Sequence, residues 1–263
     1  MTNKLFISTI LLVTSCLISC NKKDDKQSEE QIAISSTADE SNGNDSLLNS
    51  VSGNVTMKQI STFPSKVILT GLADHRLVSI YKSKATTNST ENSSRSSYSY
   101  DSDESGDESN EHFMPGIDIL FGYNLLNIAH YDLKLEKGNY LFSHPVLVKT
   151  LYYPSFTQDS LDNQPINRNY YLVSVYDEDT NKDSLINKRD LRRFYHFDAS
   201  SNIKKLIIPI DYSVVRSQYD SKNDLMYIYA RRDENKNGTQ DKTEPVHVFW
   251  FSLKTQDIAK LLY

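Results

Sequence analysis

The stretch LMYIYARRDENKNGTQDKTEPVHVFWF, residues 225–251, sets the fold class that we expect for this chain. Its two ends are short runs rich in aromatic and aliphatic residues, which favour β-strands. Between them, residues 233–244 carry Asp, Asn, Gly and Glu in the spacing D-x-N-x-N-G-x5-E. Oxygen-bearing side chains at these intervals can converge on one hard cation. The stretch therefore predicts a strand, a cation-binding loop and a second strand.

This polar segment, which we call the second loop, has an oxygen donor at every position that Ca²⁺ requires. Gly238 stands at position 6, where the main chain must turn sharply. Glu244 at position 12 can close the coordination shell with two oxygens. The predicted ligands, at positions 1, 3, 5, 7, 9 and 12, are Asp233, Asn235, Asn237, Thr239 through its carbonyl, Asp241 and Glu244.

A related segment, the first loop, lies upstream at residues 179–190 and has the sequence DTNKDSLINKRD. Ser184 replaces the glycine, which strains the turn if the backbone needs a positive φ there. Asp190 replaces the closing glutamate and has a shorter side chain, so we expect the first loop to bind Ca²⁺ more weakly. Its predicted ligands are Asp179, Asn181, Asp183, Leu185 through its carbonyl, Asn187 and Asp190.

The spacing of both loops resembles the calcium loop of EF-hand proteins, which implies Ca²⁺ as the cofactor. The end of the first loop is also similar to dockerin calcium loops, through Asn187, Asp190 and Leu191. The flanking segments read as strands on both sides, with a possible helical turn at residues 191–192 after the first loop. The alternative is that both loops are ordinary turns, because Asp, Asn and Gly are common turn residues.

The N-terminus predicts export and lipid attachment. Residues 1–19 combine Lys4 with an apolar run and are typical of a signal peptide. The segment Leu17-Ile18-Ser19-Cys20 resembles the lipobox of bacterial lipoproteins, which implies cleavage before Cys20 and acylation of that residue. Cys16 ends a competing match, but apolar residues still follow it. Residues 21–25 are similar to the export signal of surface-displayed lipoproteins in some Gram-negative bacteria, so an outer-membrane location is expected, with possible surface exposure.

The remaining chain divides by composition. Residues 20–54 are polar and acidic, which predicts a disordered tether. Residues 55–263 are expected to form one β-repeat domain, interrupted at about residues 83–112 by a Ser-rich acidic insertion that reads as a solvated loop. Residues 137–139 read as a tight turn between two strands. The mature chain would keep only the lipidated cysteine, so no disulfide within the chain is possible and Ca²⁺ becomes the candidate stabiliser.

A degenerate internal repeat supports an all-β architecture. Residues 206–219 echo residues 141–152, and each of the two segments precedes a strand and its calcium loop. Residues 127–140 look like the outer hairpin of a propeller blade, and the chain resembles β-propeller lipoproteins, including the propeller of the Tol system's periplasmic component. The expected fold is a propeller-like set of antiparallel repeats, incomplete or open, with an open stack of sheets or an irregular β-sandwich as alternatives.

Composition and the motifs that are absent from the sequence exclude several classes of function. The formal net charge of −5 argues against nucleic acid as a partner. The six histidines are scattered, and no catalytic motif for a metalloprotease, a serine hydrolase or a phosphate-binding enzyme occurs. We therefore expect no catalytic residues and a non-enzymatic binding or structural module, with the membrane as one partner through the lipid and a glycan or protein at the cell surface as another. The alternative is a surface-polymer hydrolase.

Overall fold

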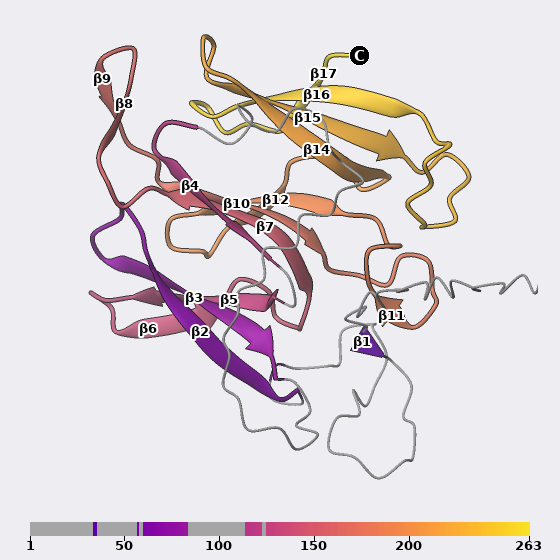
Figure 1. Cartoon of the computed structure of the whole chain (residues 1–263), viewed down its shortest axis with the longest axis horizontal. Helices are drawn as coiled ribbons and strands as arrows, with labels where there is room; N and C mark the ends of the chain where they lie inside the picture. The colour runs from indigo at the N-terminus through magenta and orange to yellow at the C-terminus, as the bar shows by residue number, and fades with distance from the viewer. Residues whose placement is uncertain (1–33, 36–56, 58–59, 84–113, 123–124) are drawn as a thin grey trace, which may run out of the picture. The chain divides into compact units, whose positions relative to one another are not determined.

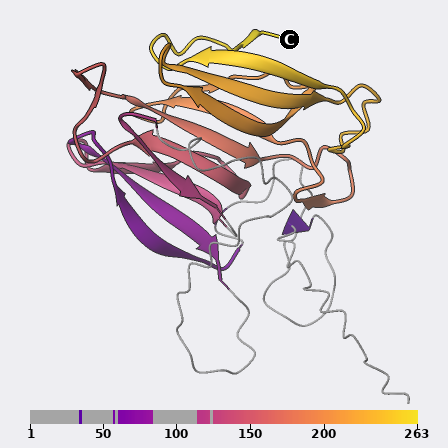
Figure 2. The same cartoon turned by 45° about the horizontal axis from the view of Figure 1, so that its top comes forward.

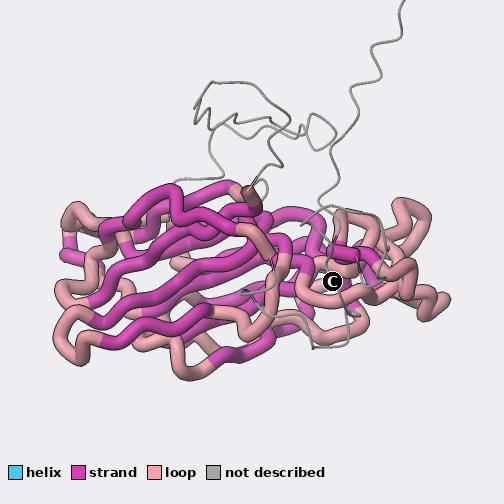
Figure 3. The backbone as a smooth tube through the Cα atoms, turned by 90° about the horizontal axis from the view of Figure 1, so that it is seen from below, coloured by secondary structure: helices cyan, strands magenta, loops and turns pink. Residues whose placement is uncertain are grey.

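A computed structural model describes residues 34–35, 57, 60–83, 114–122 and 125–263, all of which belong to the compact unit of residues 31–263. The expectation of an all-β fold is confirmed, since this part of the chain folds into antiparallel sheets and contains no α-helix (Figures 1 and 3). None of the sheets closes on itself.

The middle sheet, in the order β13-β12-β10-β7-β4, provides the framework for the other two large sheets. Its strands are β4 (Ile117–Phe121), β7 (Leu147–Pro154), β10 (Tyr170–Tyr176), β12 (Arg193–Asp198) and β13 (Lys204–Leu206). Every residue of β10 is buried. Side chains on a strand point alternately to opposite faces, so β10 is covered on both faces and other elements must pack on each side of it.

Two further sheets supply these layers. The N-terminal sheet, in the order β2-β3-β5-β6, contains β2 (Thr62–Leu69), β3 (His75–Lys82), β5 (Leu125–Asp132) and β6 (Lys137–Tyr140). The C-terminal sheet, in the order β14-β15-β16-β17, contains β14 (Tyr212–Asp220), β15 (Leu225–Arg232), β16 (Val246–Ser252) and β17 (Lys260–Leu261). Figure 2 shows the strands of the C-terminal sheet running side by side.

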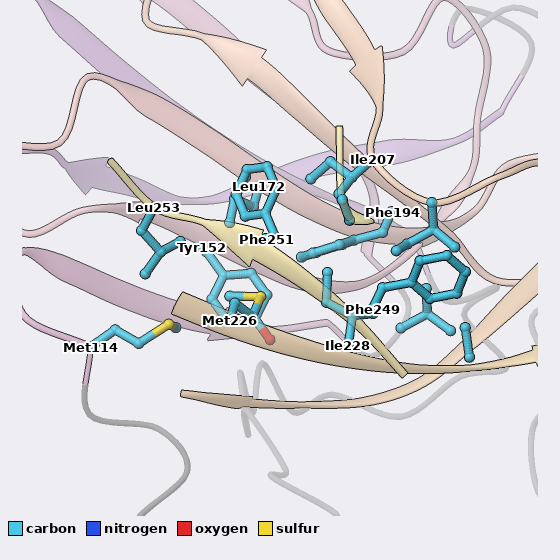
Figure 4. Packing of buried hydrophobic residues seen from close by; sticks show 14 of the residues in the cluster. Met114, Tyr152, Leu172, Phe194, Ile207, Met226, Ile228, Phe249, Phe251 and Leu253 are labelled. Atoms are coloured by element: carbon cyan, nitrogen blue, oxygen red, sulfur yellow. The ribbon is translucent and has the colours of Figure 1, made fainter. Parts of the chain in front are cut away.

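The core separates into clusters that match these layers. Tyr170 and Leu172 of β10 share one cluster with buried residues of the C-terminal sheet, such as Ile228 and Phe249 (Figure 4). Tyr171, Val173 and Val175, on the other face of β10, share a second cluster with buried residues of the N-terminal sheet. The residues therefore alternate between two hydrophobic interfaces, and apolar burial on both sides holds the three sheets together.

A buried ion pair joins the middle sheet to the C-terminal sheet. Arg168, just before β10, donates from both terminal nitrogens to the carboxylate of Asp224, just before β15, at 2.7 and 3.0 Å. Both side chains are almost fully buried. Tyr219 also donates to this carboxylate, at 3.1 Å. The ion pair thereby holds the starts of β10 and β15 next to each other. Separating them would be costly, since each charge would be left buried and unpaired.

Two small ladders complete the described part of the chain. β8 (Asp159–Leu161) pairs with β9 (Gln164–Ile166), and β1 (Ile34–Ser35) pairs with β11 (Leu185–Ile186). β1 comes from the predicted tether, and the rest of residues 20–54 lies outside the described residues. The same holds for the signal segment, for Cys20 and for nearly all of the Ser-rich insertion. Within the described part, no helix is long and apolar enough to cross a bilayer.

Two local expectations are wrong. Residues 137–139 are not a turn but belong to strand β6, and the turn of the β5–β6 hairpin lies at residues 133–136. Glu136 has a positive φ of 52° in that turn, so a non-glycine residue makes the bend that Gly138 was expected to make. Residues 191–192 form no helical turn and link the first loop to β12, which begins at Arg193.

Candidate calcium loops

The two predicted calcium loops occupy equivalent connections in neighbouring sheets. The first loop joins β10 to β12, and the second loop joins β15 to β16. Each strand pair is antiparallel and hydrogen-bonded in register. The expected strand–loop–strand arrangement is therefore confirmed at both places.

The second loop is folded around the side chain of Asp233. Its carboxylate accepts hydrogen bonds from the main-chain N–H groups of Asn237 and Gly238, at 3.1 and 3.0 Å. Asn235 and Asn237 each accept from the N–H group two residues further on, at 2.9 and 2.7 Å. Glu244 reaches back to accept from the N–H group of Glu234 at 3.2 Å. The side chains of Asp233, Asn235, Asn237 and Glu244 thus bind the loop backbone and hold it closed. The predicted ligand Asp241 does not join them, since its carboxylate accepts from the N–H group of Thr243 at 2.8 Å.

The first loop has the same pattern at the same positions. Asp179 accepts from the N–H groups of Asp183 and Ser184, at 3.1 and 2.9 Å. Asn181 and Asp183 each accept from the N–H group two residues further on, at 3.0 Å in both cases. Asp190 at position 12 accepts from the N–H group of Thr180 at position 2, at 2.8 Å. Residues 179–190 and 233–244 therefore share one internal architecture despite their different sequences.

The backbone conformation also repeats. Positions 4 and 6 have positive φ in both loops: 60° and 71° at Lys182 and Ser184, and 57° and 69° at Lys236 and Gly238. Ser184 thus adopts the left-handed conformation that glycine adopts in the second loop. The strain expected at Ser184 is confirmed, because a side chain in this region costs free energy that glycine avoids.

The two loops lie against each other. A Cβ atom added at Gly238 would stand only 1.9 Å from the carbonyl oxygen of Thr180. The Thr180 hydroxyl donates to the carbonyl of Gly238 at 2.5 Å, and Gln240 N–H donates to the carbonyl of Arg189 at 2.8 Å. Asp190 and Thr239 also form an isolated antiparallel bridge. Gly238 is therefore required both for its own turn and for the close approach of the first loop.

Burial changes the pKa of Asp190, the position-12 residue of the first loop. Asp190 is fully buried, and this desolvation raises the pKa of its carboxyl to about 6, although main-chain donors from Asn187, Asn181 and Thr180 oppose the shift. Burial, and secondly the nearby charge of Asp233, also raise the pKa of Glu244. Both carboxylates lie in places where a nearby cation would stabilise their charged form.

The fit to Ca²⁺ depends on more than the acids. Among the described residues, no three His, Cys, Asp or Glu side chains gather closely enough to hold a metal ion on their own. A calcium ion in either loop would also need the Asn oxygens and the position-7 carbonyl of Leu185 or Thr239, as Ca²⁺ commonly does. In the first loop, Arg189 binds Asp183 at 2.6 Å. This guanidinium competes with a cation for Asp183, which agrees with the weaker site expected there.

The first loop also carries the strand partner of the N-terminal segment. Ile34 lies opposite Ile186, and Ser35 lies opposite Leu185. Leu185 is the position-7 residue, and Ile186 is buried in a third cluster with Met57 and Tyr176. One side of the first loop is thereby joined to the chain that precedes the domain.

No pattern in the sequence predicted the pairing of two histidines. His75 Nδ1 lies 3.0 Å from His130 Nε2, and His130 Nδ1 lies 3.2 Å from Asn139 Oδ1. Burial lowers the pKa of His130. The two histidines lie on adjacent strands, where Leu77 is the partner of His130 and His75 is the partner of Asp132. Their wide separation along the chain gave no spacing signal.

Comparison with known proteins adds no relative. No protein-family model and no curated protein sequence matches this chain. The resemblances to calcium loops, to lipoproteins and to propellers therefore rest on the motifs quoted above.

Substitutions at position 6 of the two loops should change the stability of the protein in opposite directions. Gly238→Ala should lower the free energy of unfolding by about 1–3 kcal/mol from backbone strain alone, with a further loss from the clash with Thr180. Ser184→Gly should raise it by up to about 1 kcal/mol, because glycine removes the strain at a φ of 71°. Urea unfolding in the presence of chelator measures both changes.

Gly138→Ala is the control, because its new Cβ would meet mainly the Tyr131 ring, at 3.1 Å, and Gly138 is not at positive φ. We expect a change within about 0.5 kcal/mol. Equal losses of stability for all three variants would contradict the positive φ angles of Ser184 and Gly238.

The buried carboxyl of Asp190 predicts a pH dependence of the metal-free domain. Its pKa of about 6 in the folded state exceeds that of an unfolded Asp, so the folded state holds the proton more tightly. The free energy of unfolding should therefore fall by up to about 3 kcal/mol as the pH rises from 4 to 7. The Asp190→Asn variant should lack this component. Urea unfolding of both proteins at pH 4.5 and 7 tests it, and parallel pH profiles would contradict it.

Proposed function

We propose that this chain is a lipid-anchored protein of the cell envelope whose β-domain binds two Ca²⁺ ions and acts as a non-enzymatic binding or structural module. The observation that carries the calcium proposal is the repeated internal pattern of the two loops. In each loop, the side chains at positions 1, 3, 5 and 12 accept hydrogen bonds from the main-chain N–H groups of equivalent positions. Two unrelated turns would have no reason to share both the ligand spacing and these bonds.

Calcium in these loops would act mainly on stability. The loops join paired strands in adjacent sheets and touch through Thr180 and Gly238. A cation in each loop would offset the repulsion between carboxylates and favour the charged form of Asp190. A ligand that binds only the folded state stabilises it by mass action, so the ions would replace the disulfides that the mature chain cannot form.

The membrane proposal rests on the sequence. The lipobox-like segment that ends at Cys20 supports acylation, and the acidic composition supports a role without nucleic acid. An outer-membrane location follows from the lipoprotein resemblance, with outward exposure supported by the short polar signal behind Cys20. The partner beyond the membrane would be a glycan or a protein.

The propeller-like organisation is part of the same proposal. The three large sheets follow one another along the chain except for β4 of the middle sheet, which lies between β3 and β5 of the N-terminal sheet. The C-terminal sheet is a simple meander in the order β14-β15-β16-β17. The equivalent placement of the two loops supports a repeated unit of one sheet each. An open stack of such units would keep the blade pattern without closing a ring.

The hydrolase alternative has weaker support. The His75–His130 pair brings two titratable rings together away from the loops. His130 is only 2% exposed and both of its ring nitrogens have partners. A group enclosed in this way is better suited to joining strands than to meeting a substrate.

Calcium should raise the melting temperature of the protein. Extracellular calcium modules work at Kd values of about 10⁻⁴–10⁻³ M, so millimolar Ca²⁺ should load both loops. A tenfold excess over Kd adds about 1.4 kcal/mol per site, or roughly 2–4 °C for a domain of this size. Glu244→Gln should remove most of the shift, and Asp190→Asn should remove less. Calorimetry in chelator and in 5 mM Ca²⁺ measures these effects.

The result that would overturn the calcium proposal is an unchanged melting temperature together with no heat of binding. Asp159→Asn is a suitable control, because this carboxylate accepts from Gly116 N–H at 2.9 Å outside both loops. Its response to calcium should match that of the wild type.

Cys20 should carry the lipid. Metabolic labelling with a fatty-acid probe is expected to mark the wild type and Cys16→Ala, but not Cys20→Ala. Label that persists in Cys20→Ala and disappears in Cys16→Ala would assign the competing motif instead.

A further inference from the structure

The outward face of the C-terminal sheet carries an ordered group of aromatic rings. Tyr227 and Tyr229 alternate along β15 with Met226 and Ile228, which are buried in the core. Trp250 alternates in the same way along β16. The strand register places Tyr227 directly opposite Trp250, so the three rings gather on two adjacent strands and all are partly exposed.

Polar side chains on the edge strands flank these rings. In β14, Arg216 lies opposite Tyr229 and Gln218 lies opposite Tyr227. In β17, Lys260 lies opposite Trp250. The register therefore builds two rows across the sheet. The first row contains Gln218, Tyr227, Trp250 and Lys260, one from each strand. The second row contains Arg216, Tyr229 and Val248.

Side-chain contacts hold the rings in place. The Tyr227 hydroxyl donates to Asp220 and the Tyr229 hydroxyl donates to Gln218, each at 3.2 Å. The Arg216 guanidinium lies 3.5 Å from the centre of the Tyr229 ring, and Lys260 Nζ lies 5.0 Å from that of Trp250. Rings that are already positioned lose little conformational entropy when a ligand binds.

We infer that this face, which we call the aromatic face, binds an acidic polysaccharide. The C–H faces of a sugar ring are weakly positive and stack on the negative face of an aromatic ring. The Cα atoms of Tyr227 and Tyr229 are about 6.6–6.8 Å apart along the strand, a backbone spacing on the scale of one sugar unit. Gln218 and Asp220 offer hydrogen bonds to hydroxyl groups, and Arg216 and Lys260 offer charges to carboxylates.

The charge of the chain favours this partner over a nucleic acid. A nucleic acid would also stack on aromatic rings, but it carries a dense row of phosphates. The net charge of the chain is −5, and Asp220 adds a carboxylate to the aromatic face. A uronic-acid polymer has fewer charges and many hydroxyl groups, which matches two cations placed among aromatic and amide side chains.

Trp250 makes the proposal testable, because it is the only tryptophan in the chain. The detergent-solubilised full chain is titrated with a hyaluronan octasaccharide and with oligogalacturonate while Trp250 fluorescence is recorded. Maltooctaose serves as the neutral glycan and oligothymidylate as the nucleic acid. A saturable change is expected with the acidic oligosaccharides, and a response at least about tenfold weaker with the other two probes.

Variants locate the site. Tyr227→Ala should weaken binding of the acidic oligosaccharides by at least about tenfold, and Lys260→Gln should reduce the preference for them over maltooctaose. Tyr140→Ala is the matched control, because this tyrosine is 46% exposed on strand β6 of the N-terminal sheet, and it should bind as the wild type does. Circular dichroism before the titrations confirms that each variant is folded.

Three results would overturn the inference: no saturable change with either acidic probe, equal weakening by Tyr227→Ala and Tyr140→Ala, or tighter binding of maltooctaose or oligothymidylate. The titrations are run in chelator and again in Ca²⁺. Binding in chelator would support the aromatic face even if the calcium proposal fails, and a calcium-dependent melting temperature without glycan binding would reject the aromatic face alone.

Discussion

The burial of strand β10 on both faces is the constraint on which the rest of the structure depends. Tyr171, Val173 and Val175 require an apolar layer on one side, and Tyr170 and Leu172 require another on the opposite side. One strand thus requires three sheets. Strands buried on both faces are usual in parallel sheets with helices on each side, whereas here further antiparallel sheets provide the cover.

The packing of the C-terminal sheet on the middle sheet also determines where the two loops contact each other. β10 and β15 start side by side at the Arg168–Asp224 ion pair, and each runs from there toward its own loop. Neighbouring strands that begin together and have similar lengths also end together, which brings Thr180 against Gly238. The two adjacent sheets are thereby joined at both ends, by charge at one and by loop contact at the other.

The sequence predicted what depends on near neighbours. The strands beside the loops, the side chains at positions 1, 3, 5 and 12 that bind the loop backbone, and the strained turn at Ser184 all follow from short spacings. The contact between Thr180 and Gly238, the pairing of His75 with His130 and the double burial of β10 join residues that are distant in the chain, so no local pattern carries them. The turn expected at Gly138 was wrong because Glu136 tolerates the positive φ that the bend requires.

The pairing of β1 with β11 has a mechanical consequence. Ile34 and Ser35 meet the domain at Ile186 and Leu185, inside the first loop. Tension applied to the chain from its N-terminal side therefore reaches this two-residue ladder before it reaches any of the three large sheets. Such a short ladder separates at low force, so it would open while the three large sheets keep their shape.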